Sequence, residues 1–326
     1  MTPLLPLRTS LSFAMILAGA AAACSATTTP GTQFTTGSGG DGGSTSVAAT
    51  GSSATGGSGQ GGDSFVTTGS GGSGQGGGAP ACAKETQFIY TLAADNTLYK
   101  FDPPTLTFTV IGTLDCPNGF GTPFSMAVDR GAQAWVVFTD GTLARVDTKN
   151  AKCTPTSFAP GQSGFTTFGM GFSSNSPGST DETLFVSESS FGGSTLGLAK
   201  IDVQTLKLTP IGMYDKLNAR AELTGTGDAR LFGAFEGSPY NVAQIQKADA
   251  KVLMQAPQSA ISYPPGGSNF AFAFWGGDFW LFVGPGSSTD VFQYKPTTGV
   301  TKKVSSTSAA IVGAGVSTCA PTKPPS

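Results

Sequence analysis

The chain has 326 residues, of which 38% are hydrophobic and 12% charged, and its formal net charge is -2. Nucleic-acid binding requires clustered basic side chains to neutralise phosphates, and the lysines and arginines here form no cluster, so this partner class is excluded. Histidine is absent, which excludes Ser-His-Asp and Cys-His catalysis and removes the commonest metal ligand. An oxygen-only site would still need a D-x-D-x-D loop, which the sequence lacks, so we predict no metal and no cofactor.

The N-terminal segment has the layout of an export signal. Arg8 precedes an apolar run at 11–23, and this run is too short to span a membrane. Ala21, Ala22 and Ala23 end this run before Cys24, which resembles the lipobox of bacterial lipoproteins, where a diacylglyceryl-modified cysteine becomes the new N-terminus. The resemblance implies removal of residues 1–23 and a lipid bilayer as partner through acylated Cys24. Ala21 stands where the family prefers leucine, so cleavage without lipidation and secretion is the alternative.

Ser25 follows the candidate lipidation site, where an aspartate would favour retention at the inner membrane. By resemblance to lipoprotein sorting, this predicts a cell-envelope location at the outer membrane rather than the inner one. Residues 24–81 are mostly Gly, Ser, Thr, Gln and Ala. Such a segment cannot bury enough apolar surface to offset chain entropy, so we expect a disordered tether.

A strand motif recurs five times after the tether. LYKFD at 98–102, LARVD at 143–147 and LAKID at 198–202 are close copies, and VAQIQ at 242–246 and VFQYK at 291–295 are weaker ones. An apolar segment precedes each copy, and segments of small residues such as FSMAVD at 124–129 open most units. Units of four strands at a period of about 45 residues are typical of β-propeller blades.

The sequence therefore predicts an all-β fold: a five-bladed β-propeller of four-stranded antiparallel blades at 82–320, with a disordered tail at 321–326. The first unit lacks an inner strand, and AAIVGAGVS at 309–317 has the right composition. We expect this C-terminal strand to complete the first blade and close the ring. The architecture resembles that of WD40 and NHL-type propellers.

The cysteines fit this model. Of the five, assigning Cys24 to lipid leaves an even set that can pair in an oxidising compartment. In the closed ring, Cys319 ends the closing strand and Cys82 begins the strand beside it, so we predict a bond between them. Cys116 follows the outer strand of the first blade and Cys153 starts that of the second, which predicts the other bond.

Two-carboxylate glycoside hydrolysis is the enzyme mechanism that remains open without histidine. The acids placed to approach the channel mouth are Asp129, Glu188, Glu222 and Asp228. Asp102, Asp147 and Asp202 recur at one position of the repeat, which indicates a role in turns. Glu222 is the best candidate, but an acid near an arginine, here Arg220, is typical of a structural ion pair, so we predict no catalytic residue.

Propeller ligands usually bind at the face formed by loops that enter inner strands and loops between middle strands. These loops are 120–122, 165–166, 217–220, 263–268, 189–195 and 284–288, and they are rich in Gly, Ser, Asn and aromatic residues with little charge. This content favours a glycan or a protein over a small charged metabolite, although solvated turns are the plain alternative. The candidate binding residues are Arg220, Glu222, Glu188, Asn218, Tyr263 and Trp275, the last for sugar stacking.

These observations predict a monomeric, non-enzymatic lipoprotein of the cell envelope whose propeller presents a binding or scaffolding surface. The alternative function is a carbohydrate-active or glycan-binding propeller that uses paired carboxylates.

Overall fold

The computed structural model describes residues 82–117, 119–189, 195–263 and 269–324. The expected signal peptide, the lipidation site Cys24 and the expected tether lie outside these described residues. Within the described ranges, no helix has the length and apolar character needed to cross a bilayer.

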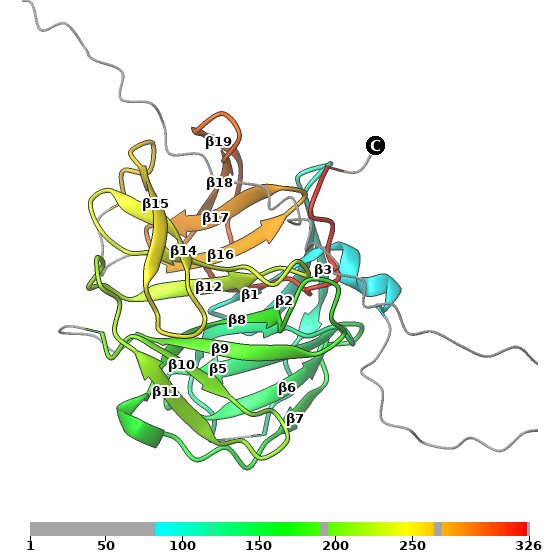
Figure 1. Cartoon of the computed structure of the whole chain (residues 1–326). Helices are drawn as coiled ribbons and strands as arrows, with labels where there is room; N and C mark the ends of the chain where they lie inside the picture. The colour runs from blue at the N-terminus through cyan, green and yellow to red at the C-terminus, as the bar shows by residue number, and fades with distance from the viewer. Residues whose placement is uncertain (1–81, 118, 190–194, 264–268, 325–326) are drawn as a thin grey trace, which may run out of the picture. The chain divides into compact units, whose positions relative to one another are not determined.

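The described residues form five four-stranded antiparallel sheets, the blades of a propeller (Figure 1). From the centre outward, the first blade is β20 (Ile311–Gly315), β1 (Ile89–Ala93), β2 (Thr97–Asp102) and β3 (Thr107–Thr113). The second is β4 (Pro123–Val128), β5 (Gln133–Phe138), β6 (Leu143–Asp147) and β7 (Cys153–Pro155), and the third is β8 (Phe168–Ser174), β9 (Glu182–Glu188), β10 (Leu198–Ile201) and β11 (Leu208–Gly212). The fourth is β12 (Ala221–Gly225), β13 (Leu231–Phe235), β14 (Tyr240–Ile245) and β15 (Val252–Gln258), and the fifth is β16 (Asn269–Trp275), β17 (Asp278–Gly284), β18 (Thr289–Lys295) and β19 (Val300–Thr307). Two short 3₁₀ helices, η1 (Lys84–Gln87) and η2 (Gln162–Gly164), lie in connections.

Small residues on the inner strands let neighbouring blades meet at the axis. Each inner strand contacts the inner strands of the two adjacent blades, in the order β20, β4, β8, β12, β16 and back to β20. A Cβ atom at Gly169 of β8 would collide with the backbone of β12, and one at Gly225 of β12 would collide with the backbone of β8. Glycine is required at these positions by close backbone approach, as the sequence pattern of small inner residues predicts.

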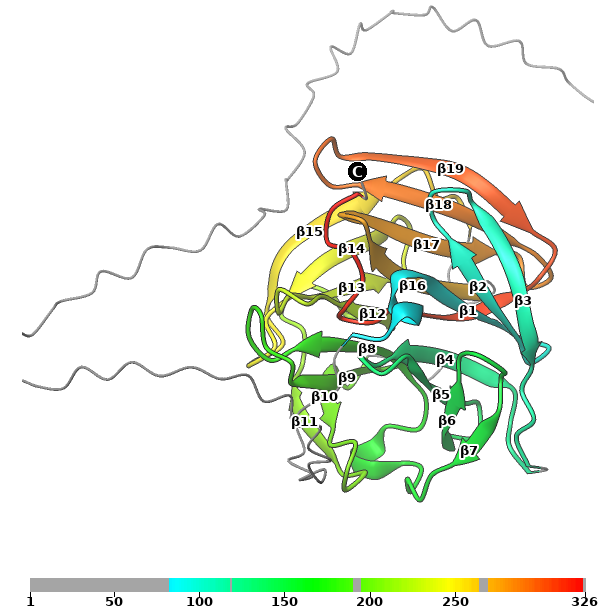
Figure 2. The same cartoon turned by 90° about the vertical axis from the view of Figure 1, so that its right-hand side faces the viewer.

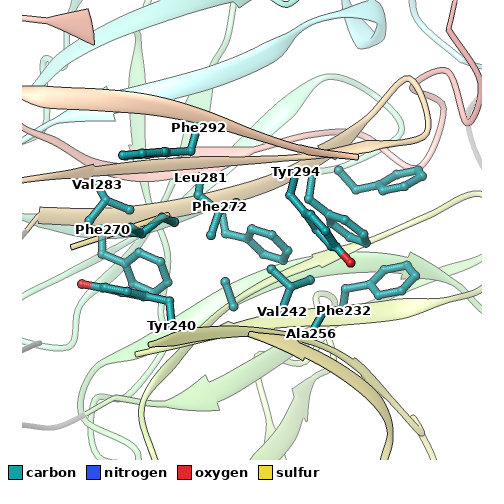
Figure 3. Packing of buried hydrophobic residues seen from close by; sticks show 14 residues of the cluster. Phe232, Tyr240, Val242, Ala256, Phe270, Phe272, Leu281, Val283, Phe292 and Tyr294 are labelled. Carbon is teal, nitrogen blue, oxygen red and sulfur yellow. The ribbon is translucent and has the colours of Figure 1, made fainter. Parts of the chain in front are cut away.

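The core consists of five clusters of buried side chains among the described residues, each between two adjacent blades. In the cluster between the fourth and fifth blades, Phe232 and Tyr240 extend from one sheet toward Phe270, Phe272 and others of the next (Figure 3). The ring of Phe279 lies 4.8 Å from that of Phe232 in an edge-to-face contact. Because no blade buries its apolar faces alone, each depends on the next for its stability.

The C-terminal strand closes the ring. β20 pairs antiparallel with β1, with Tyr90 opposite Gly315 and Leu92 opposite Gly313, so the red and cyan ends of the described domain lie side by side (Figure 2). Cys82 and Cys319 form a disulfide with a Cα–Cα distance of 5.7 Å. The predicted five-bladed fold, its closing strand and this bond are confirmed.

The second predicted disulfide joins the first two blades. Cys116, in the connection after β3, is bonded to Cys153, the first residue of β7. The neighbouring Asp115 accepts a hydrogen bond from the Cys153 amide at 2.5 Å. The disulfide and this hydrogen bond together fix the outer strand of the second blade to the segment that leaves the first blade.

Replacing Cys82 and Cys319 together by serine is expected to lower the free energy of unfolding by about 5 kcal/mol, because the bond closes a loop of 237 residues in the unfolded chain. The matched control replaces Cys116 and Cys153, which close a loop of 37 residues, and is expected to lose about 4 kcal/mol. Denaturant unfolding of both variants measures the difference. A smaller loss for the Cys82/Cys319 variant than for the control would contradict this ordering.

Candidate functional site

The propeller has two ends, which differ in their chemistry. We call the end where the chain enters the inner strands the entry face, and the end where it leaves them the exit face. The entry face carries the first residues of β4, β8, β12, β16 and β20 together with the connections between the second and third strands of each blade.

A pocket of about 230 Å³ lies on the entry face at the axis, and all five blades contribute to it. Its described lining residues are Ala94, Thr122, Pro123, Phe124, Thr139, Ser189, Arg220, Glu222, Asn269, Phe270 and Val312. The lining combines two aromatic rings with a few hydroxyl and amide groups, the usual composition of a site for a small group. Thr122, Ser189 and Arg220 belong to the loops that the sequence assigned to the binding face.

Glu222 is the exception in the ring of residues around the axis. In each blade, the first residue of the repeated motif pairs with a residue of the second strand. That residue pairs in turn with one residue of the inner strand, so the five inner residues are equivalent. In the order of the blades these inner residues are Gly313, Ser125, Gly169, Glu222 and Ala271. Four of the five are small, as the crowded axis requires, so the carboxyl group of Glu222 projects into space that its counterparts leave open.

The carboxyl group of Glu222 is buried, with 4% of the residue exposed. Its Oε2 accepts a hydrogen bond from the Ser125 hydroxyl at 2.6 Å, which links the second and fourth blades across the axis. Burial raises the pKa of Glu222 well above its usual value, and the opposing effects of Ser125, Arg220 and the Met170 amide are smaller. The raised pKa favours the protonated carboxyl group, which can donate a hydrogen bond.

Arg220 is paired with a different acid, Glu236, which follows β13. Its Nε and Nη2 atoms bind the two carboxylate oxygens of Glu236, the second at 2.6 Å. Both side chains are largely buried, with 16% and 7% exposed. This bidentate pair holds one cation and one anion together at the pocket wall, so the pocket carries little net charge.

The other candidate binding residues of the entry face lie apart from the pocket lining. Asn218 is exposed in the connection before β12. Tyr263 donates its hydroxyl hydrogen bond to Asp290 at 2.8 Å. Glu188 is 2% exposed and its carboxylate accepts from the Leu196 amide at 3.1 Å, within the connection that follows β9. These contacts stabilise the loops of the face and do not point into the pocket.

Three candidates lie at the exit face. The Asp129 carboxylate accepts hydrogen bonds from the amides of Gly131 and Gln133, both at 2.9 Å, and so caps the turn after β4. Asp228 forms an ion pair with Arg230 at 2.8 Å. Trp275 ends β16, is buried, and donates to the Gln87 carbonyl at 2.7 Å. The four candidate acids are thus divided between the two ends of the propeller.

The recurring aspartates bind their own turns. Asp102 accepts from the Thr105 hydroxyl at 2.6 Å, and Asp147 accepts from the Lys149 amide at 2.8 Å. Asp202 accepts from the amides of Gln204 and Thr205 at 2.8 and 2.9 Å. These contacts match the turn role predicted from their repeat position.

The exit face holds a second acid with a raised pKa, the half-buried Glu182, which no motif of the sequence identifies. Glu182, at the start of β9, accepts from the Arg130 amide at 2.8 Å and from the Thr318 hydroxyl at 2.7 Å. Arg130 also donates to Thr318 and to the sulfur of Cys82. Burial raises the pKa of Glu182 to about 7. The contacts connect the second and third blades to the disulfide that closes the ring.

Within the described part of the chain, no group of three or more cysteine or acidic side chains is placed to hold a metal ion. The sequence does not identify Ser125 and Glu236, which hold the pocket residues Glu222 and Arg220, because each comes from another part of the chain and no local motif marks it. Aligning the five inner strands by their pairing would have isolated Glu222 as the one large residue of its layer.

Comparisons with known proteins concern the fold and not the function. No protein-family model and no curated protein matches the chain. Among solved structures, the Dos1 propeller is similar at 16% identity with a TM-score of 0.39, and the match covers 69% of this chain and 56% of that one. A luciferin-regenerating enzyme is similar at 13% identity with a TM-score of 0.41, covering 70% and 76%. A chain of a nidogen/laminin complex is similar at 12% identity with a TM-score of 0.40, covering 71% and 85%.

The raised pKa values of Glu182 and Glu222 predict that the free energy of unfolding falls as pH rises. A carboxyl whose pKa is higher in the folded than in the unfolded chain contributes most below its unfolded pKa, and the contribution is lost as pH rises toward the folded pKa. For Glu182 this window runs from about 4.5 to about 7, and the loss is up to about 3 kcal/mol. Glu182→Gln is expected to remove the decline in that window, measured by denaturant unfolding across pH.

Glu222→Gln is the companion variant. Because the pKa of Glu222 is also raised by burial, the amide is expected to increase stability relative to wild type as pH rises above the usual carboxyl pKa. Lower stability of Glu222→Gln at pH 8 would show that the ionised carboxylate is favoured in the fold, against this assignment.

Proposed function

We propose that this chain is a lipid-anchored cell-envelope protein whose propeller is a non-enzymatic binding module, with the entry-face pocket as its ligand site. The observation that carries the proposal is the position of Glu222. Four of the five equivalent inner-strand residues are small, and the fifth brings a buried acid to the pocket where all blades meet. A group whose burial opposes its own charge is costly to the fold, which is typical of functional sites.

The pocket chemistry favours a neutral sugar unit of a glycan. Its volume is below that of pockets for drug-sized ligands and fits about one ring. Phe124 and Phe270 offer apolar surface for a sugar face, while Thr122, Thr139 and Ser189 can exchange hydrogen bonds with hydroxyl groups. A neutral Glu222 can donate to a carbonyl oxygen, such as that of an N-acetyl group.

Binding is better supported than two-carboxylate hydrolysis. Of the described residues that line the pocket, Glu222 alone carries a carboxyl group. The nearby Glu236 is committed to Arg220 through two hydrogen bonds. Glycoside hydrolysis needs a second carboxylate facing the same ligand, about 5–9.5 Å from the first. The pocket therefore supplies one partner for a glycan and lacks the pair that would cleave it.

Titration of the protein with chitotetraose, a neutral N-acetylated oligosaccharide, tests the site by calorimetry. Wild type is expected to bind, Phe124→Ala to weaken affinity about tenfold through lost apolar contact, and Glu222→Ala about three- to tenfold through a lost hydrogen bond. Glu182→Gln, with its acid at the other end, is the matched control and should bind as wild type does. Equal affinity in all four proteins would place the ligand elsewhere.

The same mixtures test the alternative function. Prolonged incubation with chitotetraose should release no new reducing ends. Cleavage by wild type that is lost in Glu222→Gln would replace the binding module with a carbohydrate-active enzyme.

The membrane part of the proposal rests on the sequence around Cys24. Acyl chains on this residue would insert into a bilayer at about 0.8 kcal/mol per buried CH₂. Wild type is therefore expected in the detergent phase after phase partitioning, and Cys24→Ala in the aqueous phase. An aqueous wild type would instead support secretion.

A further inference from the structure

A groove crosses the exit face from the fourth blade to the first. It consists of two adjoining hollows of about 240 and 380 Å³. The first is lined by Arg230, Phe274, Phe279 and Pro296, and the second by Pro103, Pro104, Leu106, Trp275, Trp280 and Val304. Gly276, Asp278, Lys295 and Pro324 line both, so the hollows are parts of one surface, which we call the exit groove.

The chain's own segment Pro321–Pro324, which we call the strap, crosses the exit groove and forms part of its wall: Thr322, Lys323 and Pro324 line the first hollow, and Pro324 also lines the second. The Gly276 amide donates a hydrogen bond to the Pro321 carbonyl at 2.7 Å. Gly276 and Gly277 have φ angles of 66° and 86°, a left-handed turn that presents bare backbone to the strap. A Cβ atom on Gly277 would lie 3.3 Å from the Thr322 carbonyl oxygen. The turn therefore presents backbone without side chains, against which an extended chain can pack.

The aromatic side chains that line the groove are buried while the strap is in place, at 4% exposed for Phe274, 7% for Trp275, 1% for Phe279 and 3% for Trp280, and the two indoles have their hydrogen bonds inside the fold. The Trp275 indole N–H donates to the Gln87 carbonyl at 2.7 Å, and that of Trp280 donates to the Trp275 carbonyl at 3.2 Å. Arg230 lies over the rings of Phe232 and Phe274 at 5.3 and 5.6 Å, and its ion pair with Asp228 offsets its charge. Rings beneath the strap, beside the Gly276 backbone donor, suit proline, which packs on rings and brings a carbonyl but no N–H.

The strap is only loosely held. Pro321 is half-buried, whereas Thr322, Lys323 and Pro324 are exposed. A short segment with this exposure gains little burial to offset the entropy of ordering it. Another chain that filled both hollows and used the Gly276 donor would bury more surface than the strap does.

We propose that the exit groove binds an extended, proline-containing segment of a partner protein, and that the strap occupies it until such a segment displaces it. This site lies at the opposite end of the propeller from the entry-face pocket and does not depend on the ligand proposed there. The strap supplies the pattern of recognition: a carbonyl on Gly276, backbone across Gly277, and a proline ring between the two hollows.

The test compares the full chain with a variant that ends at Ala320, which keeps the Cys82–Cys319 disulfide. The probe is the synthetic peptide APTKPPS, which is the sequence of residues 320–326. The control is the same peptide with every proline replaced by alanine. Binding is measured by calorimetry and by the fluorescence of Trp275 and Trp280. The shortened chain is expected to bind the proline peptide with a Kd of tens to hundreds of micromolar, at least tenfold tighter than the full chain, and not the alanine peptide.

A pair of point variants in the shortened chain separates the groove from general effects on folding. Gly277→Asn places a side chain where the strap crosses the turn, and asparagine tolerates the left-handed backbone there. Gly299→Asn is the matched control, because Gly299 has a φ of 69° and open space around its missing Cβ. Gly277→Asn is expected to weaken peptide binding at least fivefold and Gly299→Asn to leave it unchanged.

Three outcomes would overturn the proposal. One is a shortened chain that is folded, as judged by thermal unfolding, yet binds neither peptide. Another is equal affinity for the proline and alanine peptides. The third is tryptophan quenching by chitotetraose in place of the peptide, which would make the groove a sugar site.

Discussion

Around the propeller axis, the backbone of each inner strand occupies the space where the next strand would otherwise place side chains. Gly171 of β8 shows how closely the strands approach: a Cβ atom there would lie 2.8 Å from the backbone of Leu223 and Thr224. Large side chains are therefore displaced outward, where they form the five clusters between blades. Because backbone and small residues fill the axis, we expect ligand sites at the two ends of the propeller. A large residue near the axis is then a candidate for a functional role.

This constraint explains why so much of the fold was predictable. The repeated strand from LYKFD to VFQYK, the small residues before each copy and the missing first inner strand together predict the blades, their number and the closing strand. Once the ring is closed, Cys82 and Cys319 become neighbours, which spacing along the chain could never indicate. Periodicity works here because each blade repeats one packing problem, and each solution leaves the same pattern of residues.

The site was less predictable, because it depends on how the copies differ. Glu222 and Arg220 were singled out together, yet each has another partner: Ser125 for the acid and Glu236 for the arginine. Ser125 comes from a blade two places away, and Glu236 from the connection between β13 and β14 of the same blade. Local sequence places an acid beside an arginine and favours that pair, whereas the fold decides which side chains share a pocket. Glu182 and Thr318 meet for the same reason, across a separation that only ring closure removes.

The differences between blades also show where one type of contact can replace another. Asp115, after the first blade, binds the Cys153 amide, and Asp215, after the third, binds the Val252 amide in the same way. The residue after each aspartate completes the junction differently: Cys116 forms a disulfide, whereas Lys216 donates to the Val252 carbonyl at 2.8 Å. Two chemistries thus hold equivalent junctions at the outer edge, where there is room for either. The inner layer shows no such exchange: four of its five positions hold small residues. An acid retained at the fifth, at a cost to stability, is the substitution there that packing alone does not explain.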